Sequence, residues 1–134
     1  MVNIKDLISL EVALRTLAIS WVGQFISLNG LTCLLNQYKA LCVKVQLDTA
    51  EKEALAQSIR CMKTLMNNAI GLSAVVNYPS GISILALGFC CSNVKMKAMV
   101  LDMLGAVTQI PSGHALVLSA IEYYKIVKFE KFRY

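Results

Sequence analysis

Residues 61–75 (CMKTLMNNAIGLSAV) and residues 103–117 (MLGAVTQIPSGHALV) are two versions of one pattern, 42 positions apart. In each version an apolar helical stripe runs into a polar stop, then a glycine, then a second apolar stripe. The offset aligns several similar positions, among them Leu65 with Val107 and Gly71 with Gly113. A period near 40 residues is typical of helical solenoids, whose units stack side by side and present an extended groove. The pattern therefore predicts a binding scaffold and not an enzyme.

The composition is compatible with a single domain that is unusually apolar. The chain has 134 residues, of which 57% are hydrophobic and 16% charged, against about 45–50% and 25% in ordinary soluble domains. No charge interrupts Thr64 to Val94, and a membrane-spanning helix needs about 20 mainly apolar residues. However, Asn, Pro and Gly break this stretch at positions typical of turns. We therefore expect no membrane span, and keep a membrane-associated helical protein as an alternative.

Charge and cysteine usage exclude several other classes. The net charge is +5, but no basic stripe with interleaved aromatic residues indicates nucleic-acid binding. The five cysteines show neither CxxC pairs nor a Cys/His ligand spacing, and His114, the single histidine, has no catalytic partner at a recognisable distance. Free buried thiols are typical of a reducing compartment. We expect a cytoplasmic protein without metal, cofactor or catalytic site.

Hydrophobic spacing and turn residues predict a chain made of helices only. Ser20 and Ser92 are predicted N-caps, and Asp48 with Glu51 forms a capping box. Asn67 is predicted to close its helix, as a C-cap or in the left-handed region, and Gly81 to take the left-handed position of a turn. The predicted helices cover residues 4–17, 20–28, 31–43, 49–66, 71–76, 82–90, 93–109 and 114–128.

These helices group into units of three, which favours armadillo geometry over the two-helix HEAT unit. We expect one all-α domain, 1–134, in which an N-terminal helix, 4–18, precedes about three armadillo repeats. The predicted repeats cover residues 20–66, 70–109 and 113–134.

The third helix of each unit lines the concave face of such a solenoid. Here these helices are 49–66 and 93–109, and small, apolar and amide side chains near their carboxyl ends suit an amphipathic helix lying in a groove. Either a groove or a core role fits Met103 and Ala106 at this stage. The candidate groove residues are Lys63, Asn67, Met103, Ala106, Gln109 and Ile110.

Three blocks in fixed order resemble one known family. SWVGQFISLNGLTCLLN (20–36), IRCMKTLMNNAIG (59–71) and NVKMKAMVLDMLGAVTQIPSGHALVLSAI (93–121) are similar to the FH3, or inhibitory, domain of Diaphanous-related formins. The third block looks most like the Dishevelled-associated and formin-like subgroups. The resemblance covers about residues 7–133. It implies stacked armadillo repeats in a right-handed superhelix.

The resemblance also implies a function. In such formins this domain binds the amphipathic C-terminal autoregulatory helix, which holds the actin-nucleating domain inactive until a GTP-loaded Rho-family GTPase competes. The groove positions carried over are Lys63, Asn67, Met103, Ala106 and Gln109. Gln109 departs from the aliphatic residue usual there, and its neighbour Ile110 is the substitute. The implied GTPase contacts are Val12, Arg15 and Thr16, while Leu17 departs from the family pattern.

The implied protein is cytoplasmic and associated with the cytoskeleton, and meets actin only through its parent formin. We expect a truncated form with roughly three of about five repeats. The last helix then leaves apolar residues uncovered, which predicts self-association through Leu116, Leu118, Ile121 and Tyr124. The alternative to a regulatory module is a structural solenoid fragment that has lost ligand binding.

Overall fold

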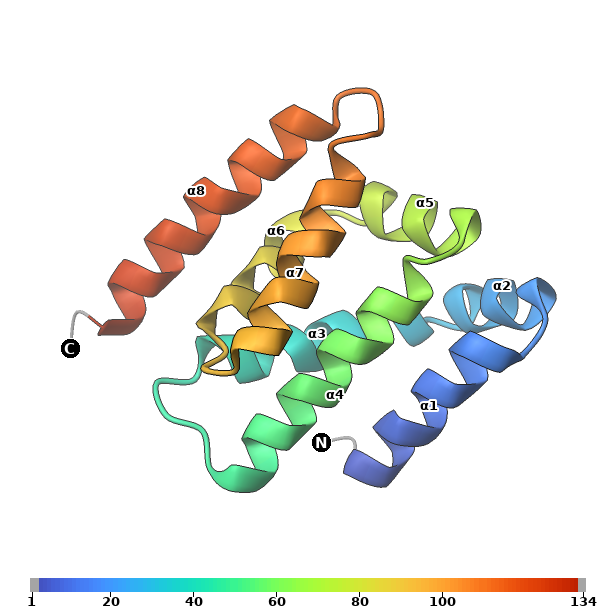
Figure 1. Ribbon diagram of the computed structural model, residues 1–134, viewed down its shortest axis with the longest axis horizontal. Helices are drawn as coiled ribbons and strands as arrows, with labels where there is room; N and C mark the ends of the chain where they lie inside the picture. Colours follow the sequence, from blue (N-terminus) through green and yellow to red (C-terminus); the bar gives the residue numbers. More distant parts are fainter. Residues whose placement is uncertain (1–2, 133–134) are drawn as a thin grey trace.

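Every element of the chain is a helix in the computed structural model, which describes residues 3–132 (Figure 1). The predicted all-α, armadillo-like solenoid is confirmed. The grouping into repeats remains a prediction, and the predicted third repeat, 113–134, ends outside the described residues. The elements are α1 (Ile4–Thr16), α2 (Ile19–Ser27), α3 (Gly30–Val43), α4 (Thr49–Leu65), α5 (Ala69–Asn77), α6 (Gly81–Ala86), the 3₁₀ helix η1 (Leu87–Cys90), α7 (Val94–Val107) and α8 (Gly113–Phe132).

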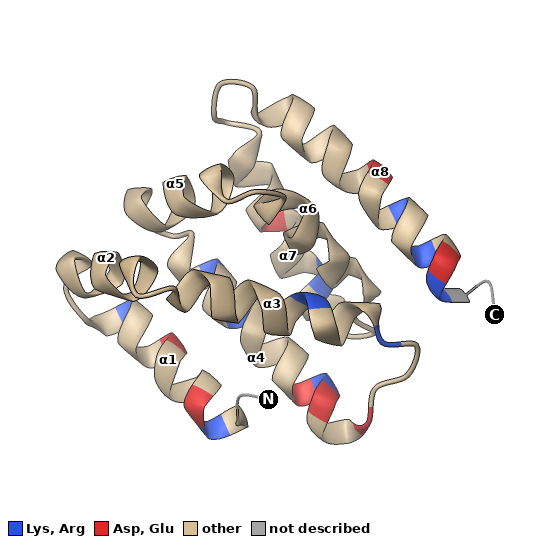
Figure 2. Ribbon diagram, turned by 180° about the vertical axis from the view of Figure 1, so that it is seen from behind, with Lys and Arg blue, Asp and Glu red and all other residues tan. Residues whose placement is uncertain are grey.

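The helices form two layers. In Figure 1, α1, α4, α7 and α8 follow one another side by side, and α1 packs on α4, α4 on α7, and α7 on α8. Behind them, α2 packs on α3 and α5, and α6 on α3 and α5. Charges are confined to part of this frame, because α2, α5 and α6 carry none and stay tan in Figure 2.

The core between the layers is dominated by leucine, with methionine, valine, isoleucine and one fully buried tyrosine among the other residues. Tyr38 is 0% exposed, and its hydroxyl donates a hydrogen bond of 2.6 Å to the carbonyl oxygen of Leu85. Burial raises the pKa of Tyr38 well above its usual value. The bond ties α3 to α6 and satisfies a polar group that would otherwise cost about 1–3 kcal/mol.

In each of the turns that follow α4 and α7, a sealing glycine lies in close contact with the end of the preceding helix. An ideal Cβ on Gly71 would lie 1.8 Å from the carbonyl oxygen of Leu65, the last residue of α4. The same atom on Gly113 would lie 1.8 Å from the carbonyl oxygen of Val107, the last residue of α7. The 42-residue offset noticed in the sequence therefore relates two copies of one backbone contact, in which no side chain fits.

Of the three helix N-caps predicted from the sequence, one is confirmed and two are wrong. The capping box is confirmed, since the Glu51 N–H donates to Asp48 Oδ1 at 2.7 Å and the Asp48 N–H to Glu51 Oε1 at 3.1 Å. Ser20 is not an N-cap, because α2 begins one residue earlier, after Ala18 and without a side-chain cap. The N-cap of α7 is Asn93 and not Ser92, and the Asn93 Oδ1 accepts a hydrogen bond from the Lys95 N–H at 2.8 Å.

Left-handed backbone also falls on unexpected residues. Ser80 (φ 62°) and Ser112 (φ 66°) take this conformation, whereas no described glycine does. Asn67 does not take it either, and the C-cap of α4 is Met66. The prediction that Gly81 takes the left-handed conformation is wrong. A glycine is needed there for a different reason, because an ideal Cβ on Gly81 would lie only 2.3 Å from the Val75 carbonyl oxygen.

Two helices differ from the prediction by more than two residues at one end. The predicted helix 82–90 is split, because α6 ends at Ala86 and residues 87–90 tighten into η1. There an ideal Cβ on Gly88 would lie 2.0 Å from the Tyr38 hydroxyl oxygen, so backbone and ring approach closely. The last helix continues four residues beyond the predicted end at 128.

Within residues 3–132, no single helix combines the length and apolar character needed to cross a membrane. Only the pair formed by Ala69–Asn77 and Gly81–Cys90, bent by 100°, meets that test jointly by length and composition.

An apolar stripe, interrupted by the exposed Glu122–Lys125 ion pair, stays uncovered along α8. Leu118 is 67% exposed, Ile126 60% and Phe129 67%, with Ile121 at 37%. Of the residues expected on this surface, Leu116 and Tyr124 are instead partly buried against the core. The stripe lies on the side of α8 that packs on neither α6 nor α7, and self-association through it remains our prediction.

The two sealing glycines should be intolerant of any side chain. We expect Gly71→Ala and Gly113→Ala each to lower the free energy of unfolding by about 1–3 kcal/mol, because Cβ overlaps a carbonyl oxygen. Gly105 lies in α7 with no atom within 4 Å of its ideal Cβ, so Gly105→Ala should stabilise by about 0.5–1 kcal/mol. Urea unfolding followed by circular dichroism measures all three. Equal changes in the free energy of unfolding at the three positions would contradict the close contact of Gly71 and Gly113 with the carbonyl oxygens.

Self-association should depend on the stripe along α8. We expect the chain to form dimers or larger species at high concentration, and Leu118→Lys with Phe129→Lys to shift it towards monomer in multi-angle light scattering. Leu28→Lys, at a residue that is 80% exposed beside α2, is the matched control and should leave the mass unchanged. A monodisperse monomer of the unaltered chain at high concentration would refute the prediction.

Candidate functional site

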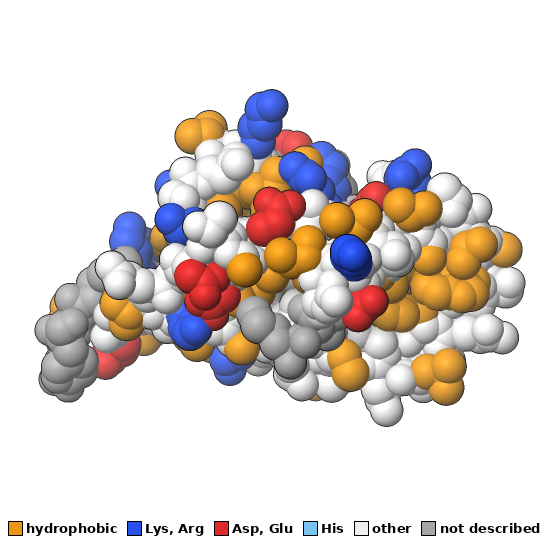
Figure 3. All heavy atoms as spheres, turned by 90° about the horizontal axis from the view of Figure 1, so that it is seen from below, with side chains coloured by type: hydrophobic (Ala, Val, Ile, Leu, Met, Phe, Trp, Pro, Cys, Tyr) orange, Lys and Arg blue, Asp and Glu red, His pale blue; other side chains and the backbone are white. Residues whose placement is uncertain are grey.

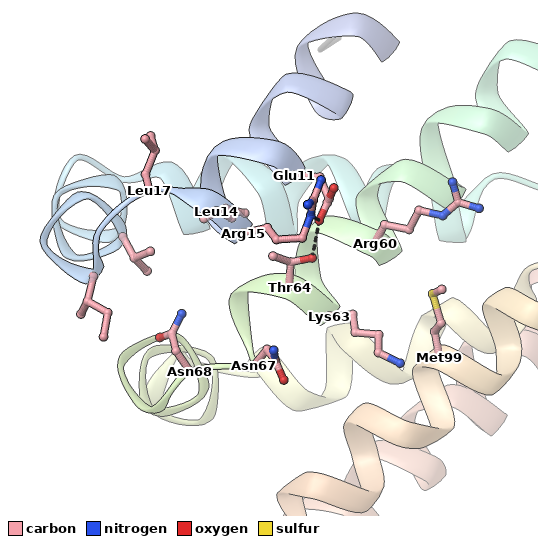
Figure 4. Close-up of a pocket in the computed structure, with 12 residues that line it drawn as sticks. Glu11, Leu14, Arg15, Leu17, Arg60, Lys63, Thr64, Asn67, Asn68 and Met99 are labelled. Atoms are coloured by element: carbon pink, nitrogen blue, oxygen red, sulfur yellow. Dashed lines mark hydrogen bonds and ion pairs between the residues drawn. The ribbon is translucent and has the colours of Figure 1, made fainter.

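A groove opens on the face formed by α1, α4 and α7. Its cavity is about 510 Å³, and Figure 4 shows the side chains that converge on it. The segment that leads from α1 into α2 also lines it. The lining residues are Glu11, Leu14, Arg15, Leu17, Ile19, Val22, Arg60, Lys63, Thr64, Asn67, Asn68 and Met99.

Glu11 holds the α1 side of the groove to the α4 side. Its Oε2 accepts a hydrogen bond of 2.8 Å from the Thr64 hydroxyl and one of 3.2 Å from Arg15 Nε (Figure 4). The Arg15 side chain is 58% exposed, so this ion pair contributes little to stability, about 0–1 kcal/mol. Its effect is to keep the guanidinium at the mouth of the groove.

The charge of the groove is positive. Arg15, Arg60 and Lys63 line it, against the single carboxylate of Glu11. At the edge, Lys63 Nζ lies 3.5 Å from Asp102 Oδ2, and both side chains are largely exposed at 45% and 68%. An exposed pair of this kind exchanges partners at low cost, so Lys63 is available to an acidic ligand. Complementary potentials of this type raise association rates and select partners.

The floor of the groove is apolar. Leu14 and Val22 are 4% and 1% exposed and close it from below, and Met99 contributes from α7. At the rim, Leu17 and Ile19 remain 48% and 57% exposed. Figure 3 shows hydrophobic side chains gathered at the end of the molecule that carries α2 in Figure 1. An apolar floor with a basic rim suits an amphipathic helix that carries acidic residues.

The structure brings some of the predicted groove residues together and separates others. Lys63 and Asn67 line the cavity. Ala106 is exposed on α7, four residues after Asp102 and on the same helix face, and Gln109 is exposed in the turn just after α7. Met103 is different, because it is 3% exposed and belongs to the core. Ile110 is partly buried just after α7.

The predicted GTPase contacts lie along one edge of α1. Arg15 lines the groove, whereas Val12 and Thr16 do not. Val12 is 41% exposed, and the Thr16 hydroxyl donates to the Val12 carbonyl oxygen at 2.7 Å. Arg15 is thus both a predicted GTPase contact and a lining residue of the groove.

Sequence reasoning missed Glu11, Arg60, Thr64, Met99 and Asp102. The sequence could have indicated Arg60 as a groove residue, because it lies three residues before Lys63 and therefore on the same helix face. Glu11 and Thr64 are 53 residues apart, and no local pattern indicates their contact. Within residues 3–132, no group of three or more His, Cys, Asp or Glu side chains is placed to hold a metal ion.

The fold and groove define a helical-repeat domain with an open, basic and apolar binding surface. Comparison with known proteins gives its family. The family model of the Diaphanous GTPase-binding domain matches residues 2–109, and the chain therefore belongs to the Diaphanous GTPase-binding domain family.

Several formins are similar to the chain along most of its length. Disheveled-associated activator of morphogenesis 2 of Gallus gallus is 38% identical over 125 residues, which are 93% of this chain and 11% of that protein. Disheveled-associated activator of morphogenesis 1 of Homo sapiens is 37% identical over 130 residues, 97% of this chain and 12% of that protein. Inverted formin-2 of Xenopus laevis is 35% identical over 115 residues, 85% of this chain and 10% of that protein. The chain thus spans about a tenth of the length of these relatives.

Proposed function

We propose that the chain is a regulatory binding module of a formin, whose groove takes an amphipathic helix with acidic residues, the C-terminal autoregulatory helix. The observation that carries this proposal is the groove itself, with an apolar floor under Arg15, Arg60 and Lys63. The contact residues in this proposal are Lys63, Asn67, Ala106, Gln109 and Ile110. Met103 supports them from the core and does not face the ligand.

The helix is proposed to lie across α4 and α7. Its acidic residues replace Asp102 as partners of Lys63, and its apolar face covers Met99 and the floor. Ala106 is small and exposed, so a ligand backbone can approach α7 closely at that point. This arrangement is the binding of an amphipathic helix in a groove.

A Rho-family GTPase is proposed to bind the adjacent edge of α1 through Val12, Arg15 and Thr16. Membership of a GTPase-binding domain family supports this proposal. Because Arg15 also lines the groove, the two ligands share one side chain and exclude each other there. Competition of this kind would let a GTPase release an autoregulatory helix.

In its biological setting the chain is proposed to act as an FH3-type armadillo domain. It is not catalytic, and it controls actin nucleation only through the formin that carries it. The similarity to formins over most of the chain supports a cytoplasmic, cytoskeleton-associated location.

One residue favours the competing hypothesis of a structural solenoid that no longer binds a ligand. Gln109 is exposed in the turn just after α7, where an aliphatic residue would match an apolar anchor. An amide left unpaired against such an anchor costs about 1–3 kcal/mol. The titration below separates the two hypotheses, because only the regulatory module binds.

Charge reversal on the groove should weaken binding of the helix. We expect a synthetic amphipathic formin C-terminal helix to bind the chain, and Lys63→Glu to weaken it about tenfold or more. Ala106→Asp should weaken it similarly by placing a charge under the ligand. Fluorescence anisotropy of the labelled helix measures both.

The matched control is Lys52→Glu, which reverses a charge on the same helix but outside the groove. It should leave the dissociation constant within about twofold of the unaltered chain. Absence of binding by the unaltered chain would favour the structural solenoid, and equal losses at Lys52 and Lys63 would refute the groove.

The shared arginine should link the two ligands. We expect Arg15→Glu to reduce binding of a GTP-loaded Rho-family GTPase about tenfold, because a charge at the contact is reversed. Lys5→Glu on the same helix is the control. In addition, the GTPase should displace the labelled helix from the unaltered chain in the anisotropy assay. Simultaneous binding of both ligands without any loss of affinity would contradict a shared site.

A further inference from the structure

A cluster of thiols lies at the opposite side of α7 from the groove, where the end of α3 meets η1 and α8. Cys42, Cys90 and Cys91 line a cavity of about 290 Å³ together with Lys97, Lys128 and Lys131. Cys90 and Cys91 also line a neighbouring hollow beside the segment that joins α3 to α4. None of these residues takes part in the groove.

Two of these thiols approach the cavity from different helices. Cys42 of α3 and Cys90 of η1 are 48 positions apart in the chain, line the same cavity, and are close enough for each to shift the pKa of the other. Cys42 is 1% exposed, whereas Cys90 is only partly buried and faces the cavity. Cys90 is therefore accessible to small molecules, whereas Cys42 is the buried second thiol of the pair.

The surroundings favour the thiolate of Cys90. Hydrogen bonding with Cys42 lowers the pKa of Cys90 to about 7 against the opposing effect of burial, and the charges of Lys131 and Lys97 lower it further. Lys131 is held in place, since its Nζ donates to the Cys42 carbonyl oxygen at 3.1 Å. Thiolates, and not thiols, are the nucleophilic form of cysteine.

The charged and titratable groups around Cys90 come from every element packed against it. Apart from the carboxylates of Glu53 beside the neighbouring hollow and of Glu51, which pairs with Lys44, they are cations, thiols or phenols. These groups are Tyr38 and Cys42 of α3, Lys44 with its partner Glu51, Lys52 and Glu53 beside the neighbouring hollow, Cys91 next to η1, Lys97 of α7, and Tyr124, Lys128 and Lys131 of α8.

Cys61 shows the contrast expected of a structural cysteine. Its thiol donates to the Leu7 carbonyl oxygen at 3.3 Å, and burial raises its pKa to about 12. It is 0% exposed and lines none of the cavities described above. The reactive environment is thus particular to the cluster at η1.

We propose that Cys90 is a modification site for small hydroperoxides and that the product is an intramolecular disulfide between Cys90 and Cys42. The Cys90 thiolate attacks a peroxide oxygen, the O–O bond breaks, and the departing hydroxide or alkoxide takes a proton, which leaves a sulfenic acid on Cys90. The sulfur of Cys42 then attacks Cys90 sulfur. Hydroxide leaves with the Cys42 proton as water, so two thiols are oxidised and one hydroperoxide is reduced.

The disulfide would tie α3 to η1 at the place where α8 docks. Phe89 of η1 packs edge-on against Tyr124 of α8, with ring centroids 5.7 Å apart, and Lys131 of α8 bonds to the backbone of Cys42. Both contacts are made by Cys42 or by the residue next to Cys90. Oxidation of the pair is therefore expected to affect how α8 packs on the rest of the domain and not to affect the groove.

The test is oxidation of the reduced full chain by hydrogen peroxide, followed by alkylation and peptide mass spectrometry. We expect Cys42 and Cys90 to become protected together, with a linked peptide pair and the loss of two hydrogens from the monomer mass. On the reduced chain at pH 7, Cys90 should be alkylated about tenfold faster than Cys61 and also before the exposed Cys33.

Variants identify the roles of the two sulfurs. Cys90→Ser should abolish the linked peptide, whereas Cys91→Ser, at the adjacent position, should keep it. Cys42→Ser should leave a sulfenic acid on Cys90 that a cyclic diketone traps. Circular dichroism confirms that each variant folds, and the alkylation order in the unaltered chain tests the reactivity of Cys90 without any variant. Oxidation first at Cys33 or Cys91, a different disulfide, or only intermolecular cross-links would overturn the proposal.

Discussion

The close approach of a glycine backbone to the end of the preceding long helix is the contact on which the architecture depends. Gly71 sits against the Leu65 carbonyl, and Gly113 against the Val107 carbonyl, with space for hydrogen only. Each contact fixes the turn by which the chain leaves α4 or α7. The two long helices therefore end in the same way, and they lie side by side in the front layer (Figure 1).

The groove is a consequence of that layer. Because α1 and α7 flank α4, the exposed face of α4 becomes the middle of a concave surface, and Lys63 meets Asp102 of α7 while Thr64 meets Glu11 of α1. The same stacking places the thiol pair on the other side, where Cys42 and Cys90 meet next to α8. One packing arrangement thus produces two chemically different surfaces, and neither depends on the atoms of the other.

Sequence patterns predicted the helices well, and the capping box at Asp48 well, because these depend on neighbours within four residues. They failed at Ser20, Ser92 and Gly81, where several adjacent residues satisfy the same local rule and packing decides between them. For Met103 the sequence left a groove role and a core role open, for a related reason. A methionine at helical spacing fits both a groove and a core, and only the position of α7 against its neighbours makes it 3% exposed.

The sequence alone determined that the chain is helical, that it repeats after 42 residues, and that Lys63 and Asn67 lie near the carboxyl end of a long helix. Periodicity and local hydrogen bonding suffice for these features. Tertiary structure alone decided that Glu11 bonds to Thr64, that Arg15 faces Lys63 across one cavity, and that Cys42 meets Cys90. These residues are 48 or more positions apart, and contacts over such distances follow from how helices stack and not from any pattern along the chain.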